Sequence, residues 1–224
     1  MSTASADGCA TDTRYGGRVA PPPPAPPPQG PPQGPPHGPL PGQPGFVVPD
    51  PQRRPRAARR AVRVLVVDED DRMLLFLDSD LGLDPVPHWW VTPGGGVDPG
   101  ESDVEAAVRE IREETGRSIA AGALVGPVLT RRAVHGYSDK VVDQTEVYYL
   151  LRVPAFDVDT SEHTEEERLT VADIRWWRRT DLASAVEDVW PRDLLAVWAL
   201  AEDPRAWRNG PVDGGSVEES TVPA

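Results

Sequence analysis

Proline dominates one part of this 224-residue chain and confines folding to the rest. Between residues 21 and 45, 14 of 25 residues are proline, and none is Asp, Glu, Lys or Arg. Such a segment cannot bury enough apolar surface to offset the entropy cost of ordering its backbone. We predict a disordered tail with a basic end over residues 1–57, one domain over residues 58–207, and a disordered, glycine-rich C-terminal tail over residues 208–224.

The proline-rich segment has two interpretations. It is either a solubilising spacer, which is the simpler one, or a weak ligand for the aromatic-lined grooves that bind polyproline helices. In the second case the protein would serve mainly as an interaction scaffold. Deleting residues 1–50 separates the two, because unchanged catalysis would leave the segment an accessory.

Composition excludes several classes of protein. All seven tryptophans lie in the predicted domain, and the one cysteine, Cys9, lies in the tail, which leaves no disulfide framework or zinc ribbon. The net charge of −13 argues against general nucleic-acid binding, although residues 53–63 carry six arginines, interpreted as a solvated lead-in to the first strand. No run of eighteen apolar residues and no secretion signal is found, so a cytoplasmic protein without membrane spans is expected.

The domain should contain strands and helices in mixed order. The predicted strands are short apolar runs rich in branched or aromatic side chains, and they span residues 61–67, 72–77, 88–92, 123–134, 141–153 and 174–177. One helix begins after Ser102 and another near Pro191. The order β-β-β-α-β-β-β-α predicts an α/β fold with a mixed sheet sandwiched between helices.

The first predicted helix combines an apolar stripe with clustered acids. Ser102 and Glu105 form a capping box, and Gly116 ends the helix. Apolar spacing predicts that one face is buried, formed by Val104, Ala107, Val108, Ile111 and Thr115. At about 100° per residue, three acids fall in one arc beside this stripe: Glu110, Glu113 and Glu114.

These acids follow a loop of three glycines, Gly94–Gly96. The simplest interpretation is a solvated acidic face, because Arg109 and Arg117 each lie four residues from Glu113 and can pair with it on the helix surface. That interpretation leaves Glu110 and Glu114 as a like-charged pair without a helical partner. A hard cation, Mg²⁺ or Mn²⁺, turns their repulsion into shared coordination, and glycines let backbone N–H groups approach phosphate oxygens.

The same residues resemble a family signature. The Nudix box has the pattern G-x5-E-x7-R-E-U-x-E-E-x-G-U, in which U is a bulky aliphatic residue. The matching positions are Gly95, Glu101, Arg109, Glu110, Ile111, Glu113, Glu114 and Gly116. Arg117 departs from the pattern at the last apolar position, which affects helix packing and leaves every acid in place.

The resemblance implies a Nudix fold and a hydrolase. Water would attack a phosphorus of a nucleoside diphosphate linked to another group, with Mg²⁺ or Mn²⁺ bound by Glu110, Glu113 and Glu114. Glu110 or Glu114 would be the base, and Arg109 would hold a glutamate in place. Gly94, Gly95, Gly96 and Glu101 would form the phosphate loop, with Glu101 stabilising the loop or reaching the metal through water.

Several questions stay open at this stage. The alternative is a Nudix-fold nucleotide-binding or regulatory module that does not hydrolyse its ligand. The partner expected is a small nucleotide or other diphosphate, and a homodimer is left open. Secondary candidates, each also explained as core or surface, are an extra base among Glu165–Glu167, Gln144 and Glu146 beside the site, and Trp89, Tyr137, Arg131 and Arg132 for substrate selection.

Overall fold

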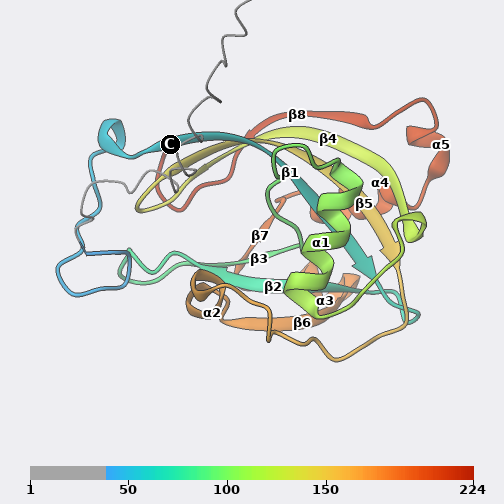
Figure 1. Ribbon diagram of the computed structural model, residues 1–224, viewed down its shortest axis with the longest axis horizontal. Helices are drawn as coiled ribbons and strands as arrows, with labels where there is room; N and C mark the ends of the chain where they lie inside the picture. The colour runs from blue at the N-terminus through green and yellow to red at the C-terminus, as the bar shows by residue number, and fades with distance from the viewer. Residues whose placement is uncertain (1–38) are drawn as a thin grey trace, which may run out of the picture. The chain divides into compact units, whose positions relative to one another are not determined.

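A computed structural model of the chain describes residues 39–224; most of the proline-rich segment lies outside the described residues. Figure 1 shows the strands and helices of this part. The strands are β1 Arg56–Val67, β2 Arg72–Ser79, β3 His88–Val91, β4 Leu124–Gly136, β5 Val141–Arg152, β6 Asp173–Arg178, β7 Asp188–Trp190 and β8 Val212–Glu218. The helices are α1 Asp103–Thr115, α2 Glu165–Thr170, α3 Arg179–Leu182, α4 Leu194–Ala201 and α5 Pro204–Trp207, with 3₁₀ turns at Pro51–Arg53 and Ala121–Ala123.

All these strands belong to one curled sheet. Its order is β7-β3-β2-β1-β5-β4-β8, and β6 pairs with β2 off this path. β1 runs parallel to β5, while β4 and β5 form a long antiparallel hairpin. The mixed sheet predicted from the order of the elements is therefore confirmed.

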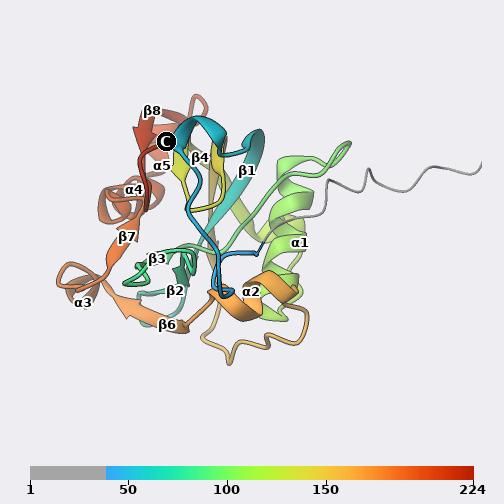
Figure 2. The same ribbon diagram turned by 90° about the vertical axis from the view of Figure 1, so that its left-hand side faces the viewer.

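The central strand β1 divides the core into two layers. Val62, Val64 and Val66 pack with Ala106, Ala107 and Ile111 of α1. Leu65 and Val67 belong to the opposite cluster, with Leu194, Val197 and Trp198 of α4. Successive side chains of a strand point to opposite faces, so a continuous apolar run suits a strand buried on both sides. Figure 2 shows α1 and α4 on opposite sides of the sheet, and the predicted sandwich is confirmed.

The N-terminal boundary of the folded part differs from the prediction. β1 begins at Arg56, so four of the six arginines in residues 53–63 belong to the strand instead of leading into it. Arg54, expected in the tail, is only 3% exposed, and its guanidinium donates to the carbonyl of Tyr137. The backbone of Arg56 pairs with that of Val141, so the ordered part of the chain begins earlier than predicted. No local apolar pattern predicts this pairing.

The prediction of a disordered segment over residues 208–224 is wrong. Val212–Glu218 forms β8, which pairs in parallel with β4 along the edge of the sheet. Glu219 follows it and is 2% exposed. Small and polar residues here satisfy their backbone groups on an existing strand, so the segment needs little apolar surface of its own.

Two smaller predictions also differ. Glu165–Glu167, expected in a loop, form the first turn of α2, capped by the Thr164 side chain. The last large helix begins at Leu194 and not at Pro191, because Trp190 still pairs with Val91 of β3. Within residues 39–224, no helix is both long and apolar enough to cross a bilayer.

Candidate functional site

The glycine loop after β3 is tied to both β1 and α1. Val62 donates its N–H to the Gly95 carbonyl at 2.9 Å, and Val64 donates to Pro93 at 2.8 Å. Gly94 has a φ of 135°, and a Cβ there would lie 2.1 Å from the Val62 carbonyl oxygen. Only glycine tolerates both the angle and the approach. Backbone hydrogen bonds therefore hold the loop alongside the central strand β1.

Helix α1 has the ends that the sequence predicts, but a different buried face. Ser102 and Glu105 make the capping box, and Gly116 ends the helix with a φ of 71°. Besides the expected Ala107, Ile111 and Thr115, the buried residues are Ala106 and Glu110. Val104 and Val108 are only half-buried. The buried face is thus rotated toward the glycine loop, which brings Glu110 into contact with it.

Arg109 organises the acidic side of α1. Its guanidinium bonds Glu101 at 2.9 Å, Glu110 at 2.8 Å and Glu113 at 3.2 Å, and donates to the Gly96 carbonyl at 2.7 Å. Planar guanidinium groups suit such forked contacts with carboxylates. Glu101 also accepts from its own loop, at Asp98 N–H. Arg109 and Glu101 thus brace the loop against the helix.

Glu110 and Glu114 meet the loop directly. A Cβ on Gly95 would lie 2.5 Å from a Glu110 carboxylate oxygen. Glu114 accepts the Gly94 N–H at 2.7 Å. Burial raises the pKa of Glu110, and burial together with the charge of Glu110 raises the pKa of Glu114 well above its usual range. Both carboxylates therefore gain from any cation that enters between them.

Glu113 lies apart from this pair. Its carboxylate is held by Arg109 and by Arg112, both at 3.2 Å. In the described part of the chain, no three acidic, histidine or cysteine side chains converge on one point. The three glutamates predicted as metal ligands are thus neighbours along α1, but their carboxylates do not converge on one point. The residues that fit a hard cation here are Glu110 and Glu114, because among the described residues the Glu110 carboxylate keeps only Arg109 and the Glu114 carboxylate only the Gly94 N–H as hydrogen-bond partners.

The loop's polar groups also serve a purpose other than the one expected. The Gly94 N–H is taken by Glu114, and the Gly95 and Gly96 carbonyls are taken by Val62 and Arg109. The glycines thus let the loop approach the acids and the central strand. The Gly94 N–H, predicted to approach a phosphate oxygen, donates to Glu114 in this structure.

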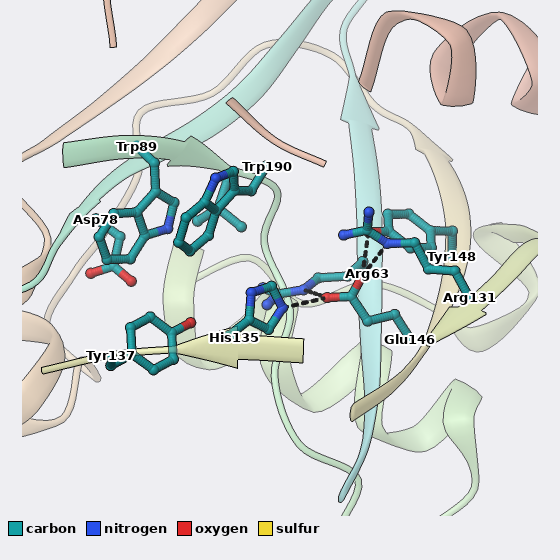
Figure 3. A pocket seen from close by; sticks show the side chains of 10 residues that line it. Arg63, Asp78, Trp89, Arg131, His135, Tyr137, Glu146, Tyr148 and Trp190 are labelled. Carbon is teal, nitrogen blue, oxygen red and sulfur yellow. Dashed lines mark hydrogen bonds and ion pairs between the residues drawn. The ribbon is translucent and has the colours of Figure 1, made fainter. Parts of the chain in front are cut away.

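An aromatic pocket lies on the far side of the loop, with a volume of about 40 Å³. Figure 3 shows the Trp89 and Trp190 rings side by side, with Tyr137 and Asp78 nearby. Trp89 and Trp190 stack with ring centres 4.5 Å apart, and Tyr137 lies 5.9 Å from Trp89. Burial raises the pKa values of Asp78 and Tyr137. This side of the pocket thus offers the flat faces of aromatic rings.

A buried ion network forms the other wall of this pocket. Glu146 contacts Arg63 at 3.2 Å, Arg131 at 2.6 Å and His135 at 3.6 Å (Figure 3). Burial alone raises the pKa of Glu146, but His135 and the two guanidinium groups outweigh it and hold the pKa well below its usual range.

Arg63 links the pocket to the glycine loop. Its Nη1 lies 3.4 Å from the Thr92 carbonyl oxygen and 3.3 Å from that of Gly94. The same guanidinium faces the pocket and holds Glu146. Arg63 thus touches both the pocket and the loop that contacts Glu110 and Glu114.

The structure separates the secondary candidates. Trp89, Tyr137, Arg131 and Glu146 line the pocket, whereas Arg132 is exposed and paired with Asp143. Gln144 lies behind the pocket and bonds Arg59 and Glu146. Glu165 and Glu166 are exposed, and the Glu167 carboxylate accepts from Thr164, although its charge reaches Glu110 and Glu114.

Sequence reasoning missed Arg63, Asp78, His135, Trp190 and Glu219. Arg63 could have been found from the sequence, because a charged residue inside the apolar run of residues 61–67 needs a buried partner. His135 could also have been found, because it lies two residues from Tyr137 and four from Arg131 on one face of a strand. Trp190 and Glu219 left no local signal, because their partners are far away in the sequence.

The chain is similar to known proteins over most of its described part. The family model described as NUDIX domain matches residues 57–197. A putative 8-oxo-dGTP diphosphatase of Bacillus subtilis is 49% identical over 63 residues, which are 28% of this chain and 38% of that protein. The asymmetrical bis(5'-nucleosyl)-tetraphosphatase of Rattus norvegicus is 38% identical over 93 residues, 42% of this chain and 58% of that protein. The matched segments thus span less than two thirds of these two relatives.

Longer matches exist as well. Nucleoside triphosphatase NudI of an Enterobacter species is 32% identical over 126 residues, covering 55% of this chain and 84% of that protein. Among solved structures, the MutT protein of Bacillus halodurans has a TM-score of 0.49 and 19% identity, covering 73% of this chain and 91% of that one. Because the family model matches well over half of the chain, the protein is a member of the NUDIX domain family.

Proposed function

We propose that this protein hydrolyses a phosphoric anhydride bond of a nucleoside diphosphate-linked substrate or a nucleoside polyphosphate, with Mg²⁺ or Mn²⁺. One observation carries the proposal: Glu110 is buried and Glu114 is half-buried against the glycine loop, and the pKa values of both are raised. Two such carboxylates are costly to keep unless a cation shares them. The names of the relatives, a diphosphatase, a triphosphatase and a tetraphosphatase, support the same class.

The metal would be held by Glu110 and Glu114. Glu113 would join them only by leaving Arg109 and Arg112. A bound divalent cation supplies neutralisation of phosphate charge and a lowered pKa for water. Arg109 positions Glu110 and the loop, and Glu110 or Glu114 accepts the proton of the attacking water. Which of the two does so stays open.

The pocket would take the nucleoside half of the substrate. Trp89, Trp190 and Tyr137 offer flat faces on which a base can stack. A volume of about 40 Å³ is smaller than a base, so Trp89 would have to move from its stack on Trp190 when a ligand enters. Arg63 would then connect the pocket with the glycine loop, against which the acids of α1 lie.

The test is a panel of nucleoside di- and triphosphates and dinucleoside polyphosphates with the full chain and Mg²⁺. Glu114→Gln should lower turnover by roughly 10²-fold or more, since it removes a ligand and a candidate base. Glu105→Gln is the matched control, because it makes the same change on α1 and keeps the capping box. It should stay within about twofold. Chelating the metal should abolish turnover.

Near-normal turnover of Glu114→Gln, or turnover that survives chelation, would refute the proposal. Nucleotide binding without hydrolysis by the wild type would favour the alternative, a regulatory module that senses a nucleotide. Self-association, location in the cytoplasm and a partner for the proline-rich segment stay predictions.

A further inference from the structure

The last strand of the chain lies outside the family match and still reaches the pocket. The match ends at residue 197, whereas β8 spans Val212–Glu218. β8 runs along β4, from Leu129 opposite Val212 to Val134 opposite Glu218. This pairing delivers the next residue, Glu219, to the strand that carries Arg131 and His135. Its side chain is buried, with 2% exposure.

Glu219 holds two parts of the pocket wall at once. Its carboxylate accepts from both terminal nitrogens of Arg131, at 3.1 and 2.7 Å. One of its oxygens also accepts the Arg192 N–H at 2.8 Å, two residues after Trp190. Its main-chain carbonyl lies 2.8 Å from His135 Nδ1. Because a carbonyl oxygen can only accept a hydrogen bond, Nδ1 of His135 carries a proton and donates it in a hydrogen bond to Glu219.

These contacts reach the residues that line the pocket. Arg131 is 4% exposed and has Glu146 as its other partner. His135 packs against Trp190 with ring centres 5.4 Å apart, and Trp190 stacks on Trp89. Removing the Glu219 charge would leave a buried guanidinium with half of its counter-charge. The backbone behind Trp190 would lose an anchor as well.

We propose that Glu219 is a positioning residue for the nucleoside pocket: it fixes Arg131, His135 and Trp190 in the arrangement that a base meets. Its carboxylate does not face the pocket, so it acts through these three side chains. The C-terminal strand is thereby a working part of the binding site. The assignment of the pocket to the nucleoside rests on the proposed function.

The test compares Glu219→Gln with Glu218→Gln, the exposed neighbour that ends β8. With the best substrate of the panel, Glu219→Gln should raise KM by about tenfold and leave kcat within about threefold, because the acids of α1 are untouched. Glu218→Gln should leave both unchanged. An unchanged KM in folded Glu219→Gln, or an equal loss in both variants, would overturn the proposal.

A second readout does not depend on catalysis. Stacked indoles give a coupled pair of circular dichroism bands, and Trp89→Phe identifies the bands due to the Trp89–Trp190 stack. Glu219→Gln should weaken these bands and Glu218→Gln should not. Bands of full strength in Glu219→Gln would show that Trp190 does not need this anchor, against the proposal.

Glu219→Asp covers the case in which Glu219→Gln does not fold. It keeps the charge and shortens the reach, so KM should rise less than in Glu219→Gln and the bands should weaken in part. A Glu219→Asp protein with wild-type KM and wild-type bands would overturn the proposal. If the wild type neither binds nor cleaves any nucleotide, the proposed function fails, and the dichroism comparison still decides what Glu219 positions.

Discussion

Single residues of the glycine loop have separate tasks, although the three glycines look alike in sequence. Gly94 is needed for its backbone angle and for the Val62 carbonyl that faces it. Gly95 makes room for the Glu110 carboxylate. At Gly96 a Cβ would meet only the Arg59 side chain, at 3.7 Å. Spacing along the chain predicts a tight loop, and only the neighbours across it tell the three positions apart.

Gly95→Ala should therefore lower activity more than stability. The added Cβ would fall 2.5 to 2.8 Å from the Glu110 carboxyl atoms, which must move away because that group is the flexible end of a side chain. A displacement of this size should lower kcat/KM by roughly 10²-fold. Gly96→Ala should stay within about twofold, since a contact at 3.7 Å is ordinary. Steady-state kinetics and melting temperatures of both variants check this, and equal activity in the two would contradict it.

At the scale of elements, the ends of α1 are determined by neighbouring residues in the sequence, whereas its buried face is determined by tertiary contacts. Its capping box and its terminal glycine lie within a few residues of what they cap, and both are found where predicted. Its buried face is set by the sheet and the loop, which bury Ala106 and Glu110 where periodicity favoured Val104 and Val108. Several faces of an amphipathic helix satisfy the same spacing, so neighbours decide between them.

Truncations on α1 should reveal which face is buried. Ile111 is fully buried, so Ile111→Ala should lower the free energy of unfolding by about 2–5 kcal/mol. Val108 is half-buried, and Val108→Ala should lower the free energy of unfolding by about 1 kcal/mol or less. Urea unfolding of the two variants measures the difference. Equal losses would mean that α1 packs by the face that the sequence pattern favoured.

For the whole molecule, the buried ion network gives stability that depends on pH. Burial by itself would raise the pKa of Glu146. His135, Arg63 and Arg131 outweigh burial and hold this pKa well below its usual value of 4.5. A carboxyl whose pKa is lower in the folded state stabilises the fold above its unfolded pKa. That contribution is lost as the pH falls from about 4.5 through the folded value.

Glu146→Gln should remove this part of the acid sensitivity. Below pH 4.5, the free energy of unfolding of the wild type should fall more steeply than that of the variant, by up to about 1.4 kcal/mol per pH unit. At neutral pH the variant should be less stable by about 3–5 kcal/mol, because two buried guanidinium groups lose a partner.

Urea unfolding between pH 3 and pH 7 measures both effects. Glu166→Gln is the control, since Glu166 is exposed and pairs only with Lys140. Its curve should run parallel to that of the wild type. Parallel curves for Glu146→Gln would contradict the charged state assigned to Glu146.

The sequence by itself determined the local parts of this protein: the capped helix, the glycine loop and the acids beside them. Each rests on contacts between residues a few positions apart, so spacing and residue type specify it. Spacing also predicted that Arg109 pairs with Glu113, which lies at 3.2 Å.

Only the tertiary structure decided the pocket and the C-terminal edge of the sheet. Arg63 and Glu146 are 83 residues apart, and Arg131 and Glu219 are 88 apart. Chain order does not say which strand edges pair, so such partners stay hidden until the sheet is assembled. Residues 208–224 show this most clearly, because their composition predicts disorder and a neighbouring strand supplies the order that their own side chains cannot.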